Sequence, residues 1–412
     1  VFGNFSVLAC YNLDKAGTIP GGFSRTRSAQ NFPVCYECAP LLAHAITYSN
    51  RKLRGSSSGQ QYLILPFSSL PEHREVLRRE LVEKPERFSL GASRDLLAQE
   101  NAIMEYFAEQ AGGDLRDALG FSLIFFREDK ASWRIQAEVN QVLPSRVKQI
   151  QEAISKIERD ELLSFGKDES KPLRVDTRML GLFAENRNGT GNELRAWLTA
   201  LFASKTIQRK TFFRHLTGHI LAVAKATPQF FPYTVRQAWG VYRFAILSKL
   251  IERGEDCMVF ETPKSRYGEF IADHPDFFYC PELVTAFLTG CYASVVCGVQ
   301  RQERGHAPFS KKFLGRMMDR GKLMRIYNDG HDKLGVYDKL GLVATDLDPD
   351  LAQSWIDAGS SKDWRASNDE LSFAFTLGYS LQWRIRHLGN DKLHMLADET
   401  SESNDGSEAF LD

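Results

Sequence analysis

The pattern of apolar and polar positions near the start of the chain predicts β-strands. Tyr62–Pro66 and Phe121–Phe126 are short apolar runs of the length of a buried strand. From Trp133 to Val139, apolar and polar residues alternate with a period of two, which is typical of a half-buried strand. The polar segment Arg127–Lys130 separates the last two runs. We therefore expect a β-hairpin that turns at this segment.

Helical spacing replaces the alternation from about residue 145 onward. After Pro144, which suits the first turn of a helix, the apolar residues Val147, Ile150, Ile154 and Ile157 recur three or four positions apart. Similar spacing predicts further helices almost to the end of the chain. The expected helices cover residues 145–163, 192–203, 206–225, 233–252, 281–300, 309–323 and 367–387. The fold class is therefore α+β, with a mixed N-terminal part and an all-α remainder.

These patterns divide the chain into three expected domains and a tail. Residues 1–144 form an α+β domain, 145–270 a helical region rich in basic and aromatic residues, and 271–395 a C-terminal helical bundle, of which about residues 280–390 could fold alone. The apolar run within 281–300 is short and diluted by polar residues, so we interpret it as a buried helix rather than a membrane span. Residues 396–412 are expected to be an acidic, disordered tail.

The overall composition describes a folded protein without a global charge. The chain has 412 residues, 43% of them hydrophobic and 25% charged, and its 52 basic residues balance its 52 acidic ones. This balance excludes a nucleic-acid binder that is basic throughout, but not one that is basic locally. Seven cysteines without a regular spacing favour reduced thiols in a cytoplasm.

One local charge imbalance points to nucleic acid. Between residues 194 and 251 there are nine Lys or Arg residues and no Asp or Glu, and aromatic residues lie among the bases. Lys and Arg side chains neutralise phosphates, and aromatic rings stack on unpaired nucleobases. The alternative is a helical core whose bases pair with acids from elsewhere in the fold. A second basic run covers residues 301–339. The candidate nucleic-acid-binding residues are Lys205, Arg209, Lys210, Arg214, Arg236, Lys311, Lys312 and Arg316. A helix would gather most of the first four on one side, with Phe212, Leu216 and Ile220 facing the core.

Two cysteines at close spacing form the best local motif for a metal. Cys35 and Cys38, in a turn before a helix that starts near Pro40, would supply half of a tetrahedral zinc site. Cys10 is the candidate third ligand. A pair of plain thiols and a redox-active pair are the alternatives.

A competing interpretation makes the chain a metal-dependent phosphohydrolase or nucleotide-processing enzyme. Such an enzyme of the HD type uses a His, an adjacent His-Asp pair and a distant Asp, for which His306, His331-Asp332 and Asp346 or Asp348 are the candidates. The His-Asp pair, however, lies in the Gly- and Asn-containing segment 328–333, which predicts a solvated turn. We therefore expect no catalytic residue.

Several short motifs, in order along the chain, resemble the large subunit of the type I-B CRISPR Cascade complex. The first group is Asp14–Gly17, Pro20–Phe23, Asn31–Cys38 and Tyr62–Pro66. The second is Phe121–Phe126, Val142–Arg146, Ala286–Gly290 with Gln300, and Asp369-Glu370 through Phe375–Gly378. Members of that family usually carry another Cys pair before the position of Val1, so completion of the zinc site by this chain stays open.

This resemblance implies a non-catalytic subunit of a prokaryotic, cytoplasmic, RNA-guided antiviral complex. The front domain would recognise the protospacer-adjacent motif (PAM), and the C-terminal helices, similar to the complex's small subunit, would line the DNA. The implied partners are the guide crRNA, the double-stranded target DNA, the backbone, crRNA-end-binding and small subunits, and a recruited helicase-nuclease. No membrane is implied.

Overall fold

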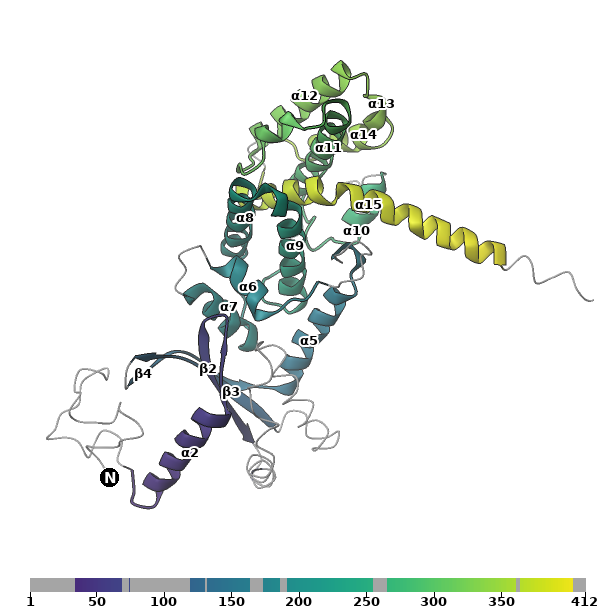
Figure 1. Cartoon of the computed structure of the whole chain (residues 1–412). Helices are drawn as coiled ribbons and strands as arrows, with labels where there is room; N and C mark the ends of the chain where they lie inside the picture. Colours follow the sequence, from purple (N-terminus) through teal and green to yellow (C-terminus); the bar gives the residue numbers. More distant parts are fainter. Residues whose placement is uncertain are drawn as a thin grey trace, which may run out of the picture. The chain divides into compact units, whose positions relative to one another are not determined.

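The structure is a computed structural model that describes residues 34–68, 74, 119–129, 132–163, 173–185, 191–254, 265–360 and 364–402. The chain, drawn in Figure 1, divides into two compact units by the contacts within it. Unit 1 comprises residues 1–156, 174–206 and 247–250, and unit 2 comprises residues 157–173, 207–246 and 251–412. The chain is mixed α+β, as predicted. The expected domain boundaries at residues 144, 270 and 395 stay a prediction.

A four-stranded antiparallel sheet organises unit 1. Its strands β1 (Arg54–Ser57), β2 (Gln60–Ser68), β3 (Leu119–Asp129) and β4 (Ser132–Val142) follow one another in space as they do along the chain. The predicted strands and the hairpin are confirmed, but the turn is shorter than expected, because Arg127–Asp129 still pair with Ser132–Arg134. The apolar alternation of β4 is only partly buried. Ile135 and Ala137 oppose the adjacent residues Phe126 and Phe125, so a bulge leaves Ile135 65% exposed.

Four helices complete the described part of unit 1, namely α2 (Cys38–Lys52), α5 (Pro144–Glu158, whose last two residues belong to unit 2), α6 (Thr177–Ala184) and α7 (Asn192–Phe202). Side-chain caps fix two of the helix starts. The Asp176 carboxylate accepts a hydrogen bond from the Met179 amide at the start of α6. The Glu185 carboxylate accepts from the amides of Gly191 and Leu194 at the start of α7.

The described elements of unit 2 are helices, with one isolated β-bridge between Ile207 and Ile251. Its longer helices are α8 (Arg209–Ala226), α9 (Phe231–Leu247), α11 (Pro281–Arg304), α12 (Arg320–Val336), α14 (Leu347–Asp357) and α15 (Asn368–Glu402). Its shorter elements are α10 (Arg266–Ala272), α13 (Gly341–Ala344) and the 3-10 helices η5 (Glu161–Leu163), η6 (Pro228–Phe230) and η7 (Pro308–Lys312).

The crossing of α11 and α15 forms the centre of unit 2 (Figure 1). Two glycines permit it. A Cβ on Gly290 would lie 2.1 Å from the Phe375 carbonyl oxygen, and one on Gly378 would lie 2.0 Å from that of Phe287. Helix α11 is long and apolar enough to cross a membrane, but 83% of its most apolar window is buried inside the protein. The prediction of a buried helix is therefore confirmed.

An aromatic cluster packs α8 and α9 against α15. The Phe213 ring centroid lies 5.6 Å from that of Tyr242 and 5.5 Å from that of Phe373. Trp239 stacks on Tyr242 at 5.3 Å and also contacts Phe277. These side chains are fully buried. The aromatic residues of the acid-free stretch thus serve mainly as core.

Three sequence-based predictions need correction in unit 2. The helix expected at 309–323 is replaced by η7 and then by α12, because Phe309, Phe313 and Met318 are buried at a spacing that no single helix face provides. Residues 328–333, predicted as a turn, lie inside α12. Helix α15 continues to Glu402, so the first residues of the expected disordered tail are helical, and residues 403–412 lie outside the described residues.

Candidate nucleic-acid interface

Helix α8 separates a packing face from a basic face. Phe212, Leu216 and Ile220 are fully buried, as the spacing predicted. Lys210, Arg214 and Lys225 are exposed. At 100° per residue, these three bases fall within about 60° of one another around the helix, away from the buried stripe. Since α8 contains no acid, its exposed face carries positive charge only.

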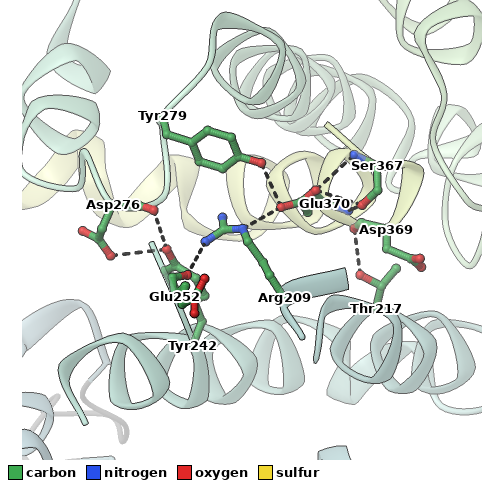
Figure 2. A network of polar contacts seen from close by, with 9 residues as sticks. All are labelled: Arg209, Thr217, Tyr242, Glu252, Asp276, Tyr279, Ser367, Asp369 and Glu370. Carbon is green, nitrogen blue, oxygen red and sulfur yellow. Dashed lines mark hydrogen bonds and ion pairs between the residues drawn. The ribbon is translucent and has the colours of Figure 1, made fainter. Parts of the chain in front are cut away.

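Arg209 does not belong to this face, which corrects its assignment as a phosphate contact. Its side chain is 15% exposed, and its Nε donates to Glu370 Oε1 at 2.8 Å (Figure 2). Its guanidinium also lies over the rings of Phe213 and Tyr279, at 4.9 and 4.7 Å. The alternative interpretation, a base paired with an acid from elsewhere in the fold, is therefore correct for Arg209. It is also correct for Arg243, whose Nη1 lies 3.4 Å from Asp276 Oδ1.

Glu370 connects this ion pair to the start of α15. The Tyr279 hydroxyl donates to Glu370 Oε1 at 3.0 Å, and the Ser367 amide and hydroxyl donate to Oε2. Ser367 Oγ in turn accepts from the Glu370 amide, so the two residues form a capping box (Figure 2). Burial raises the pKa of Tyr279, which therefore stays a neutral donor. The network attaches the first turn of α8 to α15.

The basic side chains of α8 act electrostatically on Asp369, which lies beside the capping box. Thr217 Oγ1 donates to its carbonyl oxygen at 2.9 Å, which places α8 and α15 side by side here (Figure 2). Burial raises the pKa of the Asp369 carboxyl, whereas the charges of Arg214 and Lys210 lower it. Neither base forms an ion pair with a carboxylate of the described residues. Both side chains therefore remain able to contact an external anion.

The other end of α8 reaches the loop after η7. The Cγ of Lys225 would lie 2.6 Å from a Cβ on Gly315, so the Lys225 side chain packs along this glycine, the residue before Arg316. Phe309 and Phe313 are buried and anchor the segment, and the Phe309 amide donates to Gln300 Oε1 at 2.9 Å. Arg316 and Lys311 remain exposed.

We define the α8–η7 basic surface as Lys210, Arg214, Lys225, Lys311 and Arg316. Lys312, on the same 3-10 helix, pairs with Asp329 at 2.5 Å and is therefore partly neutralised. Exposed basic side chains that form no ion pair attract phosphates and release the counterions around them. This surface can therefore bind a polyanion electrostatically.

Two further predicted site residues lie elsewhere. Lys205 is exposed in the loop after α7, in unit 1, so α8 does not align it with Arg214 as expected. Arg236 on α9 is half-buried. Among the aromatic residues of the acid-free stretch, Phe230 and Tyr233 are exposed by 56% and 43% and could stack on a nucleobase.

The cysteine pair adopts the predicted arrangement without a visible third ligand. Helix α2 starts at Cys38, whose amide donates to Cys35 Sγ at 3.2 Å, and both thiols are exposed. The hydrogen bond from Cys38 lowers the pKa of the Cys35 thiol. Two thiolates supply half of a zinc site, and no group of three metal-ligating residues occurs in the part of the chain that the structure describes. Cys10 lies outside it, and zinc stays a prediction.

The His-Asp pair lies on helix α12 and not in the predicted turn. Its turn-like composition is overridden by Leu323, Ile326 and Leu334, which are buried at helical spacing. His331 Nδ1 lies 3.4 Å from the Tyr292 hydroxyl. Its charge also lowers the pKa of Asp348, which burial raises. His306 contacts the Arg304 carbonyl oxygen through its own Nδ1. The described residues thus bring His331 near Asp348 but form no three-ligand cluster with His306.

Comparison with known protein families decides the broad class. A family model described as the CRISPR-associated protein TM1802 C-terminal domain matches residues 178–392, and one described as the central domain of the same protein matches residues 1–142. The first match alone covers more than half of the chain. The chain belongs to the CRISPR-associated protein TM1802 family. A search of curated proteins finds no match.

The residue ranges of the two matches show which structural elements belong to each TM1802-family domain. The C-terminal match includes all five residues of the α8–η7 basic surface and the Arg209–Glu370 network. The central-domain match includes the sheet and the cysteine pair. The resemblance to a CRISPR protein is confirmed at this level, and the type I-B subtype stays a prediction. Lys225 was not among the predicted site residues of this TM1802-family chain, although its spacing of 11 and 15 residues from Arg214 and Lys210 fits one helix face.

Proposed function

We propose that this chain is a non-catalytic large subunit of a type I-B RNA-guided surveillance complex and holds nucleic acid on its α8–η7 basic surface. The observation that carries the proposal is the separation of charges on α8. The basic residue that the fold uses, Arg209, is half-buried and paired, whereas Lys210, Arg214 and Lys225 are exposed and unpaired among the described residues. Membership of a CRISPR-associated family supports a nucleic-acid ligand for such a surface.

Within this proposal, partners and tasks follow the resemblance. The chain binds guide crRNA and double-stranded target DNA together with the backbone, crRNA-end-binding and small subunits. Its N-terminal part takes part in recognising the PAM, and a recruited helicase-nuclease performs the cleavage. The basic surface contacts phosphates, so its contribution is independent of base sequence.

The competing function is an HD-type phosphohydrolase. Its strongest support is the position of His331 on a helix, near Asp348. Against it, His331 lies against the Tyr292 hydroxyl, and the described residues supply no third ligand beside the pair. We therefore treat catalysis as an outcome to be tested, with the double variant His331→Ala, Asp332→Ala as the diagnostic change.

The test is target binding by the complex assembled with guide RNA. The triple variant Lys210→Ala, Arg214→Ala, Lys225→Ala should bind target DNA at least about tenfold more weakly than the wild-type complex, since three phosphate contacts are lost. The matched control removes two exposed basic residues of α12 and one from the segment that follows it, through Arg325→Ala, Lys333→Ala and Lys339→Ala.

The two triple variants lose the same charge, so only position distinguishes them. Equal target affinity for the two would contradict the proposed surface. Turnover of DNA or nucleotides by the chain alone with Mg²⁺ or Mn²⁺, abolished in the His331→Ala, Asp332→Ala variant, would favour the phosphohydrolase.

A further inference from the structure

Unit 1 contains a polar cavity at a junction of three elements. The cavity has a volume of about 520 Å³ and lies where the end of β4, the first turns of α5 and the end of α7 meet. Its lining includes the charged residues Glu138, Arg146 and Lys205 and the polar residues Ser145 and Gln149. This volume falls in the range of small-ligand pockets, which is about 300–1,000 Å³.

Arg146 is the buried cation of this cavity. The residue is only 6% exposed, and no carboxylate of the described residues forms an ion pair with it. Its Nε donates to the Leu201 carbonyl oxygen at 2.7 Å, and its Nη1 donates to Gln149 Oε1 at 2.5 Å. Its Nη2 has no hydrogen-bond partner. A buried guanidinium favours an anionic ligand when it has no counter-charge, and the Nη2 of Arg146 still has N–H groups to donate.

The surroundings of Arg146 add positive potential. Helix α5 has 15 residues and no acid in its first turn, so its N-terminal dipole faces the cavity uncompensated beside Ser145. Lys205 is exposed at the cavity, and its backbone position is fixed because its amide donates to the Ala200 carbonyl oxygen at 2.9 Å. Glu138 is the opposing acid among the lining residues, and it is exposed.

We propose that this cavity binds one phosphate group of a nucleotide unit, with Arg146 as the buried anchor and Lys205 as the exposed contact. Gln149 is half-buried and lines the same cavity, so a phosphate oxygen replaces its amide oxygen at the guanidinium. The inference rests on the proposed function, because a nucleic-acid-binding subunit supplies the ligand. It adds a second contact site, in unit 1, that the α8–η7 basic surface does not include.

The experiment compares AMP, adenosine and inorganic phosphate as ligands of the full chain, by calorimetry and by the rise in unfolding temperature that binding to the folded state produces. AMP should bind and adenosine should not. Lys205→Ala should weaken AMP binding about tenfold, as should Arg146→Lys, which keeps the charge but loses the fork. Glu138→Gln should strengthen it. Lys205 and Glu138 are exposed, so their substitution tests the site even where Arg146→Lys impairs folding.

The α8–η7 triple variant serves as the control that separates the two sites. It should leave AMP binding unchanged, whatever it does to target DNA. Equal binding of adenosine and AMP, or an AMP affinity insensitive to both Lys205→Ala and Glu138→Gln, would overturn the site. Inorganic phosphate binding as tightly as AMP would overturn the assignment to a nucleotide unit. If AMP binds as expected while the α8–η7 triple variant binds target DNA normally, only the proposed basic surface fails.

Discussion

Arg209 at the start of α8 and Glu370 at the start of α15 form a 2.8 Å ion pair, although 161 residues separate them in the sequence. The pair is nearly inaccessible to solvent and continues into the Ser367–Glu370 capping box. It holds the N-terminal ends of two helices together. The exposed bases of α8 therefore project from a fixed backbone.

We predict that Arg209→Ala destabilises the protein by about 3–5 kcal/mol, because the buried carboxylate of Glu370 loses its counter-charge. Arg214→Ala, one turn further on the exposed face, should change stability by no more than about 0.5 kcal/mol. Chemical denaturation of both variants measures the difference. The double variant Arg209→Met, Glu370→Leu should be more stable than Arg209→Ala alone. Equal stability of Arg209→Ala and Arg214→Ala would show that the pair is not formed.

A second prediction concerns the glycines at the α11–α15 crossing. Gly290→Ala and Gly378→Ala place a Cβ about 2 Å from a backbone carbonyl oxygen, which only a separation of the helices relieves. Each should destabilise the protein by about 1–3 kcal/mol or more. Gly298→Ala on α11 is the control, since no atom lies within 4 Å of its Cβ position. It should be neutral or stabilise by up to about 1 kcal/mol through helix propensity. A destabilisation by Gly298→Ala as large as that by Gly290→Ala would contradict the crossing.

The third prediction is a pH dependence that originates at His274. This side chain is 8% exposed, packs on Trp239 and Phe270, and contacts the Phe270 carbonyl oxygen through Nδ1 at 2.7 Å. Burial lowers the pKa of His274, and Arg243 adds to the effect, whereas the Phe270 carbonyl and the nearby Asp276 and Asp273 oppose it. The folded state therefore favours the neutral imidazole, and the unfolded state binds more protons.

The stability that the neutral His274 side chain contributes is complete above its pKa in the unfolded state, which is about 6.5. It is lost as the pH falls toward the lowered pKa of His274 in the folded state. Denaturation of the wild type between about pH 7.5 and 5 should show declining stability, and His274→Gln should reduce the slope. A wild-type slope retained in full by His274→Gln would assign the pH dependence to other groups.

The fourth prediction concerns the C-terminal bundle. About residues 280–390 of this bundle were expected to fold alone, but Phe373 packs on Phe213 of α8 and Trp239 of α9, and Glu370 pairs with Arg209. A fragment of residues 271–395 should therefore lack a cooperative thermal transition, whereas residues 207–402 should show one. Circular dichroism of both fragments makes the comparison. A cooperative transition of the shorter fragment would restore the original domain boundary.

Local patterns were sufficient where the apolar spacing was continuous. They predicted helices α8, α9 and α11, the hairpin of β3 and β4, and the buried stripe of Phe212, Leu216 and Ile220. They failed for α12, because its sequence around Asn328 to Asp332 is typical of turns. A buried Gly330, whose Cβ position lies 3.1 Å from the Tyr292 ring, and the buried Leu334 keep this segment helical against α11.

The candidate site could be predicted only in part, for a related reason. The missing acids identified residues 194–251 as basic, but not which of the basic residues the fold uses. Arg209 and Arg243 are paired by Glu370 and Asp276, and no local spacing indicates partners so distant in the chain. Lys225 fits the same helix face by its spacing from Lys210 and Arg214, and only the structure shows its proximity to Gly315, a contact across 90 residues.

The salt dependence of nucleic-acid binding by the full chain tests the central claim most directly. If about four phosphates are neutralised by the α8–η7 basic surface, the logarithm of the binding constant falls against the logarithm of salt concentration with a slope of about −3 to −4. The Lys210→Ala, Arg214→Ala, Lys225→Ala variant should bring this slope to about −1, for all sequences alike, while the Arg325→Ala, Lys333→Ala, Lys339→Ala control should keep the wild-type slope. A wild-type slope in the α8 variant would contradict the account and assign this face to contacts with protein.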